Sequence, residues 1–526
     1  MNMYNNMIML ALLGWLLLGL PGVPAAAAAG LRTHSVAHAT NLPVREICTD
    51  TCSKAKNGVC EEGRPGKVVT NSPFRMAYCD LGTDCDDCGP WKTTSTNISW
   101  IDGKKAGPIR LLQSRDVQVR VKNAAVPQEI GFSFAYTDPK QDFDVSYHME
   151  NAGMVEAGIT AIAYKLMSGR CVKQGGNREL FVDVGANFGW FAILAAKLGC
   201  KVIAYEPVPL FRAFFEFSVH LNDLAFLIDI RDTVVSHESD TLMKMVVPAR
   251  GIWGTAGIDG LNIDRAIQSD QEAIEVRSVR LEDEIKDDVL LLKIDVEGWE
   301  WSVVKGAEKL LKKYHVENVI MEYSPGVPER HFKWDHMAAT PAMLVDLITK
   351  FEYRIGHIGD AGKHQSSGWD SKLIPLKEIT MENLKYDVED IKLWQAGTLA
   401  CPVPDELKEF EMWALCGGVP EGLNPRSLRS EIGHNTNIWA SKGDGLKHLI
   451  LHGVVGILSP SDPTEKYFQD NEMNFGMGSR PCHFLDPRVL VKHRCKCTQP
   501  EVCGKEEEAV RKAAAERRIP QNYVLK

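Results

Sequence analysis

The pattern of apolar and polar residues switches between strand and helix spacing in the middle of the chain. Residues 179–184 form a short apolar run rich in β-branched side chains, which predicts a buried strand. A turn of small residues follows at 185–189, and apolar residues then recur at helical spacing over 190–198. Residues 201–205 predict a second strand. Strand, glycine turn, helix and strand make a βαβ unit, which is right-handed and has parallel strands.

The same two periods predict further elements on both sides of this unit. In chain order they are a strand or hairpin around 117–121, a helix at 149–167, a helix at 210–224, a strand at 228–232, an edge strand at 275–280, a strand at 289–294, a helix at 298–314, a strand at 319–323, a helix at 344–351 and a strand at 353–358. Alternating strands and helices are typical of an α/β domain.

The turn at 185–189 has the chemistry of a cofactor-binding turn. Glycines let the backbone pass close to a ligand, and the following helix directs unpaired N–H groups toward it. Glu206 follows the second strand, 21 residues after Gly185, where a carboxylate can accept hydrogen bonds from ribose hydroxyls. The turn reads G-A-N-F-G, without the G-x-G spacing of dinucleotide-binding proteins, and Asp183 precedes it. A carboxylate there repels a pyrophosphate and attracts a cationic amino acid or sulfonium, which favours S-adenosylmethionine over NAD.

A second stretch, after residue 288, adds a motif of its own. The segments FVDVGANFGWFA (181–192), AYEP (204–207), KIDVEGWEWSVVKGAEKLL (293–311) and VIMEYSP (319–325) stand in this order. In these segments the chain resembles the FkbM-type family of S-adenosylmethionine-dependent methyltransferases, over about residues 145–360. The resemblance implies a doubly wound, Rossmann-like sheet with helices on both faces. It also implies O-methylation of a hydroxyl, often on a sugar or a polyketide.

Six residues are expected to bind the cofactor: Asp183, Gly185, Asn187, Gly189, Glu206 and Asp232. Asp232 follows the third strand, where this class often places an acid or an amide near the adenine amino group. An ordinary surface aspartate is the alternative interpretation of Asp232.

Two acids after the strand at 289–294 are the catalytic candidates. A hydroxyl becomes a good nucleophile only when a general base within hydrogen-bond reach takes its proton. Asp295 ends that strand at the carboxyl edge of the sheet, where ligands of such folds bind. We expect Asp295 to act as base or orienting group, supported by Glu297 or Glu322, with no metal. Two alternatives stay open: Asp295 could cap the next helix, or paired carboxylates could hold Mg²⁺ against a diol substrate.

Length and charge limit the other possibilities. The chain has 526 residues and a formal net charge of −9, without a basic cluster. A nucleic-acid-binding protein would need a positive face, so we expect none of that activity. The expected organisation is a signal segment at 1–29, a cysteine-rich module at 45–92, a methyltransferase domain at 145–360 and an extension at 361–526.

The N-terminal part indicates the secretory pathway. Residues 7–20 are apolar and small residues follow, as in a cleaved secretory signal, whereas residues 7–29 together could form an uncleaved membrane anchor. Six of the fourteen cysteines lie between Cys48 and Cys88, which is typical of a disulfide module, although Cys85 and Cys88 have zinc-ligand spacing. Four acids nearby could hold Ca²⁺ or, the preferred interpretation, be solvated: Asp80, Asp84, Asp86 and Asp87. Asn97 begins a glycosylation sequon.

The extension is less informative. It carries six cysteines, which we expect to form disulfides in an oxidising lumen: Cys401, Cys416, Cys482, Cys495, Cys497 and Cys503. The sequence therefore predicts a luminal or secreted O-methyltransferase that acts on a glycan or a related small polyol. The rival hypotheses are a nucleotide- or NAD-binding enzyme on a similar sheet and a secreted binding protein without catalysis. The sequence does not set the oligomeric state.

Overall fold

The computed structural model describes most of the chain between residues 42 and 452. Within that range it leaves out 66–71, 97, 102–104, 264–270, 330, 332, 360–368, 370–374, 397–422, 425, 431, 433 and 434. The N-terminal apolar segment, the Asn97 sequon and the six cysteines of the extension lie outside the described residues. Among the helices that are described, none has both the length and the apolar character needed to cross a bilayer.

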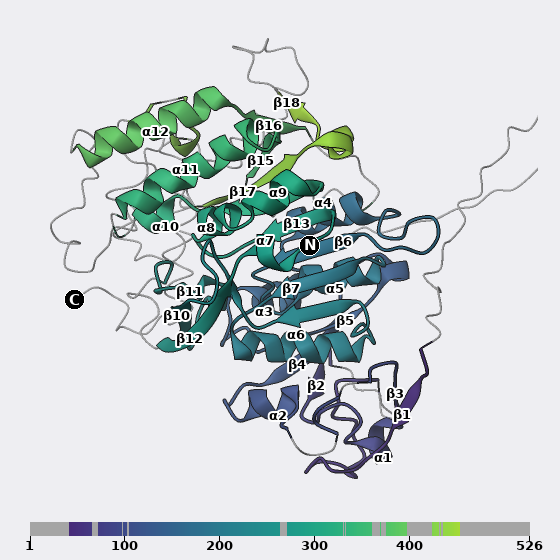
Figure 1. Cartoon of the computed structure of the whole chain (residues 1–526). Coiled ribbons are helices and arrows are strands. Elements are labelled where there is room, and N and C mark those ends of the chain that lie inside the picture. The colour runs from purple at the N-terminus through teal and green to yellow at the C-terminus, as the bar shows by residue number, and fades with distance from the viewer. Residues whose placement is uncertain are drawn as a thin grey trace, which may run out of the picture. The chain divides into compact units, whose positions relative to one another are not determined.

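A nine-stranded mixed sheet forms the centre of the fold (Figure 1), in the order β18-β16-β15-β17-β14-β13-β6-β7-β8. The five strands from β14 to β8 are parallel to one another. The strands of this sheet are β6 Leu180–Val184, β7 Lys201–Tyr205, β8 Ile228–Arg231, β13 Val289–Ile294, β14 Val316–Tyr323, β15 Arg354–Gly359, β16 Leu376–Ile379, β17 Thr436–Ser441 and β18 Leu451–His452. The parallel core confirms the predicted α/β class.

Helices cover both faces of the parallel core. The helices are α1 Cys85–Cys88, α2 Pro108–Gln113, α3 Val145–Ala152, α4 Ala157–Met167, α5 Trp190–Lys197, α6 Pro209–Leu221, α7 Leu281–Glu284, α8 Glu300–Lys305, α9 Glu308–Lys313, α10 Gly326–Glu329, α11 Trp334–Thr349 and α12 Met381–Gln395. Successive strand residues point to opposite faces. Phe181 and Leu291 therefore pack with residues of α4, α5 and α6, and Val182 and Leu292 pack with residues of α8, α9 and α11.

Three smaller sheets flank this core. A four-stranded sheet has the order β11-β10-β12-β9, a three-stranded one has the order β2-β4-β5, and β1 pairs with β3. Their strands are β1 Arg45–Ile47, β2 Arg75–Ala77, β3 Trp91–Thr93, β4 Val119–Asn123, β5 Ser133–Tyr136, β9 Val234–Val235, β10 Leu242–Pro248, β11 Gly257–Ile258 and β12 Gln271–Val279. A strand is present over 275–279 of the predicted residues 275–280, as part of β12. Its prediction as an edge strand is wrong, because β12 lies between β10 and β9 and pairs with both.

Two predicted helices are each divided in two. The helix expected at 149–167 breaks after Gly153, and Glu156 has the left-handed φ of 40° that side chains rarely adopt. The helix expected at 298–314 breaks at Gly306 into α8 and α9. A Cβ at Gly306 would lie 2.1 Å from the carbonyl oxygen of Ser236, so only glycine permits this close packing. The first break places Glu156 close enough to Lys293 and Asp295 for their charges to act on it.

The sheet continues past residue 360. Strand β17 lies between β14 and β15 and is antiparallel to both. Strand β16 and helix α12 also come from this part of the chain, and β16 pairs with β15. The described part of the extension thus contributes strands to the sheet that carries the methyltransferase-like motifs.

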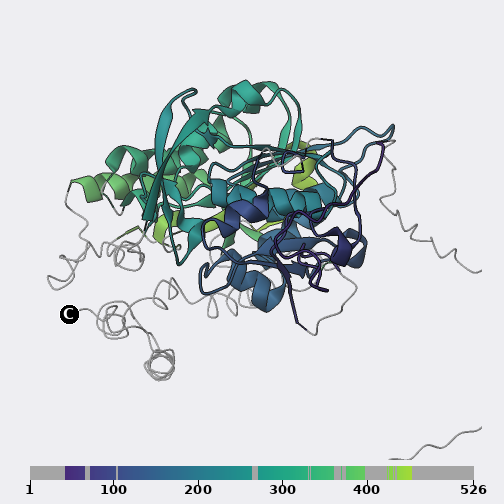
Figure 2. The same ribbon diagram turned by 90° about the horizontal axis from the view of Figure 1, so that it is seen from below.

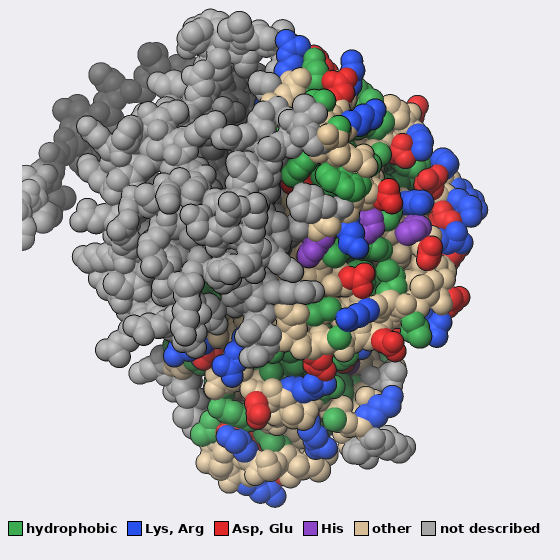
Figure 3. Space-filling view, turned by 90° about the vertical axis from the view of Figure 1, so that its left-hand side faces the viewer, with side chains coloured by type: hydrophobic (Ala, Val, Ile, Leu, Met, Phe, Trp, Pro, Cys, Tyr) green, Lys and Arg blue, Asp and Glu red, His purple; other side chains and the backbone are tan. Residues whose placement is uncertain are grey.

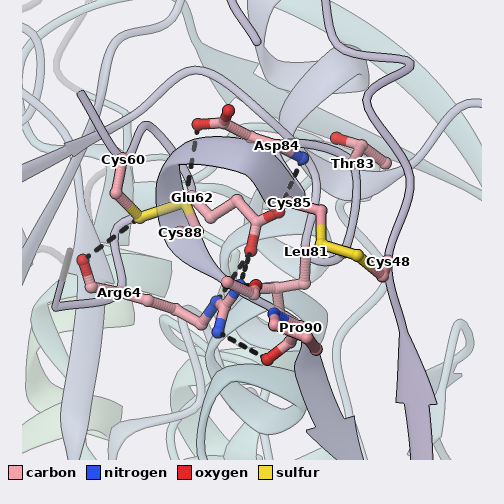
Figure 4. Close-up of polar contacts among 12 residues, drawn as sticks. Cys48, Cys60, Glu62, Arg64, Leu81, Thr83, Asp84, Cys85, Cys88 and Pro90 are labelled. Atoms are coloured by element: carbon pink, nitrogen blue, oxygen red, sulfur yellow. Dashed lines mark hydrogen bonds and ion pairs between the residues drawn. A yellow bond between two sulfur atoms is a disulfide. The ribbon is translucent and has the colours of Figure 1, made fainter. Parts of the chain in front are cut away.

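The N-terminal cysteines form three disulfides, Cys48–Cys85, Cys52–Cys79 and Cys60–Cys88. Zinc binding by the CxxC pair is excluded, because Cys85 and Cys88 are both in disulfides. Figure 4 shows the polar interior of this module, where Glu62 accepts a hydrogen bond from the Asp84 amide at 2.8 Å and pairs with Arg64 at 2.6 Å.

The preferred interpretation of the module's acids as solvated groups is wrong for three of the four. Asp80, Asp84 and Asp87 are buried, and only Asp86 is exposed. Asp87 accepts hydrogen bonds from the amides of Asn57 and Gly58 at 2.9 and 3.1 Å, so it fixes the loop between two of the disulfides.

The cysteine module, drawn in purple in Figure 2, packs against helix α6. Oδ1 of Asp223, just after α6, accepts hydrogen bonds from Thr93 Oγ1 and the Thr94 amide at 2.9 and 2.8 Å. The rings of Trp91 and Trp100 stack at 6.3 Å, and both contact His220 of α6 edge-on. These contacts attach the module to the C-terminal end of α6.

A fourth disulfide lies inside the central domain. Cys171 and Cys200, both fully buried, are bonded between the segments that precede β6 and β7. Among the described cysteines, all eight are therefore in disulfides.

Surface charge is mixed over the described part of the face in Figure 3. Lys and Arg side chains (blue) are interspersed with Asp and Glu side chains (red) on that part of the surface. The absence of nucleic-acid binding stays a prediction.

Candidate active site

The parallel strands β6, β7, β13 and β14 end at one edge of the sheet, and the predicted site residues follow these ends. The turn after β6 begins with Gly185, whose φ is 82°. A Cβ at Gly185 would lie 1.8 Å from the carbonyl oxygen of Asp295. The amides of Gly185 and Ala186 both donate to the carbonyl oxygen of Tyr205, at 3.0 Å. The glycine turn is thus held tightly between the ends of β13 and β7.

Gly189 lets the turn pass into helix α5. Its φ is 83°, and a Cβ would lie 2.0 Å from the ring of Phe215 in α6. Asn187 also has a left-handed φ, of 51°, and its side-chain oxygen Oδ1 is buried without a hydrogen-bond partner among the described residues. The turn therefore offers one acceptor that a ligand can satisfy.

Glu206 follows β7 and joins the glycine turn. Its Oε2 accepts a hydrogen bond from the amide of Asn187 at 2.7 Å, and its Oε1 accepts one from the amide of Val208 at 2.8 Å. Burial raises the pKa of Glu206 to about 7, although both amides and the Arg212 charge act to lower it. The structure thus brings Glu206 against Asn187 of the glycine turn, 19 residues earlier in the sequence.

Asp183 is the most deeply buried acid of the site. It is 0% exposed, and neither carboxylate oxygen makes a hydrogen bond of ordinary geometry within the described part of the chain. Burial raises its pKa to about 6, and the nearby Lys293 charge opposes that shift. An unsatisfied buried carboxylate needs a donor or a cation, so Asp183 is suited to binding a ligand ammonium group.

Lys293 is the cation at the centre of these acids. It lies opposite Asp183 in the paired register of β13 and β6, and its Nζ donates to Oδ2 of Asp295 at 2.9 Å. Its Nζ also lies 4.7 Å from the centroid of the Phe191 ring. Burial acts to lower the pKa of Lys293, but the charges of Asp295, Asp183 and Glu156 raise it above its ordinary value. The neighbouring acids therefore favour the charged ammonium form of this side chain.

The candidate catalytic acids lie close together. Carboxylate oxygens of Asp295, Glu297 and Glu322 are all within 4.8 Å of one another. Burial and mutual repulsion raise the pKa values of Glu297 and Glu322 well above the ordinary range. Asn262 donates a hydrogen bond to Glu297, and Asn435 donates one to Glu322.

Asp295 does not cap the helix that follows it. The carboxylate of Glu300 instead accepts hydrogen bonds from the amides of Val296 and Gly298, at 3.2 and 3.0 Å. The alternative interpretation of Asp295 as an N-cap is wrong, because its carboxylate faces Lys293. Glu297 itself has a left-handed φ of 57° in this turn, and Gly298 follows with 95°.

Asp232 is less closely connected to the site. It is exposed, directly after β8, and the structure gives it no hydrogen bond to the other predicted residues. Its proposed contact with an adenine group stays a prediction.

Other residues join the site without having been predicted for it. Glu156 and Asp144 lie close enough for their charges to act on each other, and burial raises the pKa of Glu156 to about 7 and that of Asp144 well above its ordinary range. Gly153, inside an otherwise helical pattern, was the available signal for the break that exposes Glu156 to the sheet edge. A Cβ at Gly254 would lie 2.5 Å from Asp144 Oδ2, so this glycine makes room for the carboxylate.

Comparison with known proteins agrees with the geometry. Residues 183–355 match the family model of the methyltransferase FkbM domain. A search of curated proteins gives no match.

Three of the solved structures that are similar to the chain share little sequence with it. One is a methyltransferase FkbM from Methylobacillus flagellatus KT, with 17% identity and a TM-score of 0.22 over 36% of this chain and 43% of that one. The second is a putative methyltransferase from an antibiotic biosynthesis pathway of Anabaena variabilis ATCC 29413, with 12% identity and a TM-score of 0.21 over 50% and 91% of the two chains.

The third structure is phosphoethanolamine N-methyltransferase 2 of Haemonchus contortus in complex with S-adenosyl-L-methionine. It has 10% identity and a TM-score of 0.22 over 62% of this chain and 69% of that one. The alignment to the first structure spans less than half of that protein's length. These similarities are too low to transfer a substrate to this chain.

Proposed function

We propose, from the premise that residues 183–355 form a methyltransferase FkbM domain, that the chain is an S-adenosylmethionine-dependent O-methyltransferase of the secretory lumen. The observation that carries the proposal is the pair of buried acids around one glycine turn. Glu206 is hydrogen-bonded to the turn through Asn187, and Asp183, two residues before the turn, has no hydrogen-bonded partner in the part of the chain that the structure describes.

The two acids fit the two ends of the cofactor. Asp183 can receive the ammonium group of the amino-acid part, and Glu206 can accept hydrogen bonds from ribose hydroxyls. The strand order β8-β7-β6-β13-β14 supports a Rossmann-like site, since the turn after the first strand then lies at the switch point of the sheet. Bound here, S-adenosylmethionine supplies a methyl group on a positively charged sulfur. The buried carboxylate of Asp183 disfavours a dinucleotide pyrophosphate at this turn.

Asp295 is the proposed general base. Its hydrogen bond to Lys293 fixes the orientation of the carboxylate, and the side chain is 27% exposed, so a substrate hydroxyl can reach it. The hydroxyl proton would pass to a carboxylate oxygen as the nucleophile forms. Burial of the surrounding groups keeps competing water away from the reacting oxygen.

The proposed compartment and substrate rest on the cysteines and the N-terminus. Four disulfides, one of them inside the central domain, are compatible with an oxidising compartment. The apolar segment at 7–29 would direct the chain into the secretory pathway, as a cleaved signal or as an anchor. Glycans carry many hydroxyl groups and are attached to proteins of that compartment, so we propose a glycan or related polyol as methyl acceptor.

Mass spectrometry tests the substrate class. Glycans released from cells that express the protein are compared with glycans from cells that express Asp183→Asn. The proposal expects a glycan species heavier by one CH₂ unit only in the first sample. Identical glycan profiles, with a methylated non-glycan product in the first sample, would contradict the glycan assignment.

A further inference from the structure

Three carboxylates converge at the carboxyl edge of the sheet, and the ion pair described among them joins Asp295 to Lys293. Asp295 follows β13, Glu297 lies two residues further on, and Glu322 lies on the neighbouring strand β14. Their oxygens approach within 4.8 Å of one another. The described cation at this position, Lys293, is hydrogen-bonded to Asp295 and also faces Asp183.

One carboxylate oxygen of Glu322 has no hydrogen-bond partner in the described part of the cluster. The residue is 8% exposed, and its Oε2 is shielded from solvent with no hydrogen-bond partner among the described residues. Its other oxygen, Oε1, accepts a hydrogen bond from Asn435. A buried carboxylate oxygen without a donor is costly unless a ligand satisfies it.

The surroundings hold the carboxylates in place. Asn262 donates to Oε2 of Glu297, as Asn435 does to Oε1 of Glu322, so an amide orients each glutamate. Such outer hydrogen bonds are typical of carboxylates that bind metal ions. Three oxygen ligands at one sheet edge suit a hard divalent cation, which completes its shell with water and substrate oxygens.

We infer that Asp295, Glu297 and Glu322 bind one divalent cation of the Mg²⁺ or Mn²⁺ class. This inference deepens the proposed function, and the role of the cation in turnover rests on that function. The cation would hold the acceptor hydroxyl, and a neighbouring hydroxyl of a polyol would occupy a second position on the metal. This inference departs from the metal-free site that the sequence predicts.

Methyl transfer from S-adenosylmethionine to the acceptor hydroxyl needs no further reactant. In this arrangement Asp295 is a metal ligand instead of the general base, and the metal-bound hydroxyl loses its proton to water, because a bound cation makes the hydroxyl more acidic. The oxygen then forms a bond to the methyl carbon, the carbon–sulfur bond breaks, and its electron pair returns to sulfur. The products are a methyl ether and S-adenosylhomocysteine.

Titration of the full chain with Mn²⁺ tests the inference. Electron paramagnetic resonance of free Mn²⁺ gives the number and affinity of bound ions for the wild type, Glu297→Gln and Glu322→Gln. Glu308→Gln is the matched control, because Glu308 pairs with Lys312 at the surface of α9. Thermal unfolding monitored by circular dichroism verifies that each variant is folded.

The wild type and Glu308→Gln are expected to bind one Mn²⁺ that Mg²⁺ displaces, and each of the other two variants to bind that ion at least about tenfold more weakly. Equal Mn²⁺ binding by all four proteins, or no binding by the wild type, would overturn the inference. S-adenosylhomocysteine binding is measured in parallel on the same samples. If the wild type does not bind S-adenosylhomocysteine, the proposed function is refuted. The Mn²⁺ measurement still decides separately whether the metal site exists.

Discussion

The ammonium nitrogen of Lys293 lies 2.9 Å from Oδ2 of Asp295. The same lysine stands opposite Asp183 across the paired strands β13 and β6. One buried cation therefore links the acid proposed to bind the cofactor with the acid proposed to act on the substrate. Without it, the buried carboxylate of Asp183 and the partly exposed carboxylate of Asp295 would repel each other without a compensating cation.

Replacing this lysine should destabilise the fold. Lys293→Met is expected to lower the free energy of unfolding by about 3–5 kcal/mol near neutral pH, since it leaves buried carboxylates without their cation. The loss should shrink toward pH 5, where Asp183 and Glu156, with pKa values raised to about 6 and about 7, take up protons. Urea unfolding measures both effects, and Lys201→Met, an exposed lysine at the start of β7, is the control. A loss independent of pH would contradict the charge assignment.

A methyl group at Gly185 should disrupt the site. The Cβ of Gly185→Ala would lie 1.8 Å from the Asp295 carbonyl, and φ is 82°. Gly175→Ala is the matched control, because Gly175 has a similar φ of 91° with nothing within 4 Å of its Cβ. The control is expected to cost about 1 kcal/mol, from backbone strain alone. Gly185→Ala should cost at least about 2 kcal/mol more; equal costs in chemical unfolding would refute the close approach.

The pH dependence of stability should report on Glu206. Its pKa rises from the ordinary 4.5 to about 7 on folding, so its ionisation increasingly destabilises the folded state as pH rises through this window. Glu206→Gln removes that contribution. Between pH 4.5 and 7, the stability of the wild type should fall relative to the variant by at most about 3 kcal/mol. The exposed Glu238→Gln should follow the wild type; parallel curves for all three proteins would contradict the buried, ionisable Glu206.

The disulfide inside the central domain is a separate prediction. Peptide mapping without reductant should recover Cys171 linked to Cys200. The double change Cys171→Ala with Cys200→Ala should lower the free energy of unfolding by about 3 kcal/mol, because the bond closes a loop between residues 29 apart. Recovery of Cys171 as a free thiol in protein purified from the secretory lumen would contradict the pairing.

Much of the parallel core follows from the sequence alone. Strands β7 and β13 begin and end at the predicted residues, because strands buried on both faces are continuous apolar runs. Asp183, Glu206 and Asp295 could be placed at one edge, since the ends of parallel strands coincide there. The pairing of Asp295 with Lys293 is harder to predict from the sequence. Residues two apart share a face only while the strand continues, and β13 ends at Ile294, before Asp295.

Other features depend on contacts that local patterns do not encode. Strand β17 enters between β14 and β15 from more than 70 residues beyond β15 along the chain, and its six residues give a weak periodic signal. Predicting the pairing of Cys171 with Cys200 requires knowing that the segments before β6 and β7 lie side by side in the fold. The burial of Asp84 was missed because its partners, the Glu61 and Glu62 residues, come from another loop of the module.

Calorimetric titration with S-adenosylhomocysteine tests the central claim most directly. The wild-type chain should bind one equivalent, Asp183→Asn should bind at least about tenfold more weakly because the ligand ammonium loses a buried charged partner, and NAD should give no heat of binding. Binding of NAD by the wild type without binding of S-adenosylhomocysteine would contradict the assignment of the glycine turn and its two acids.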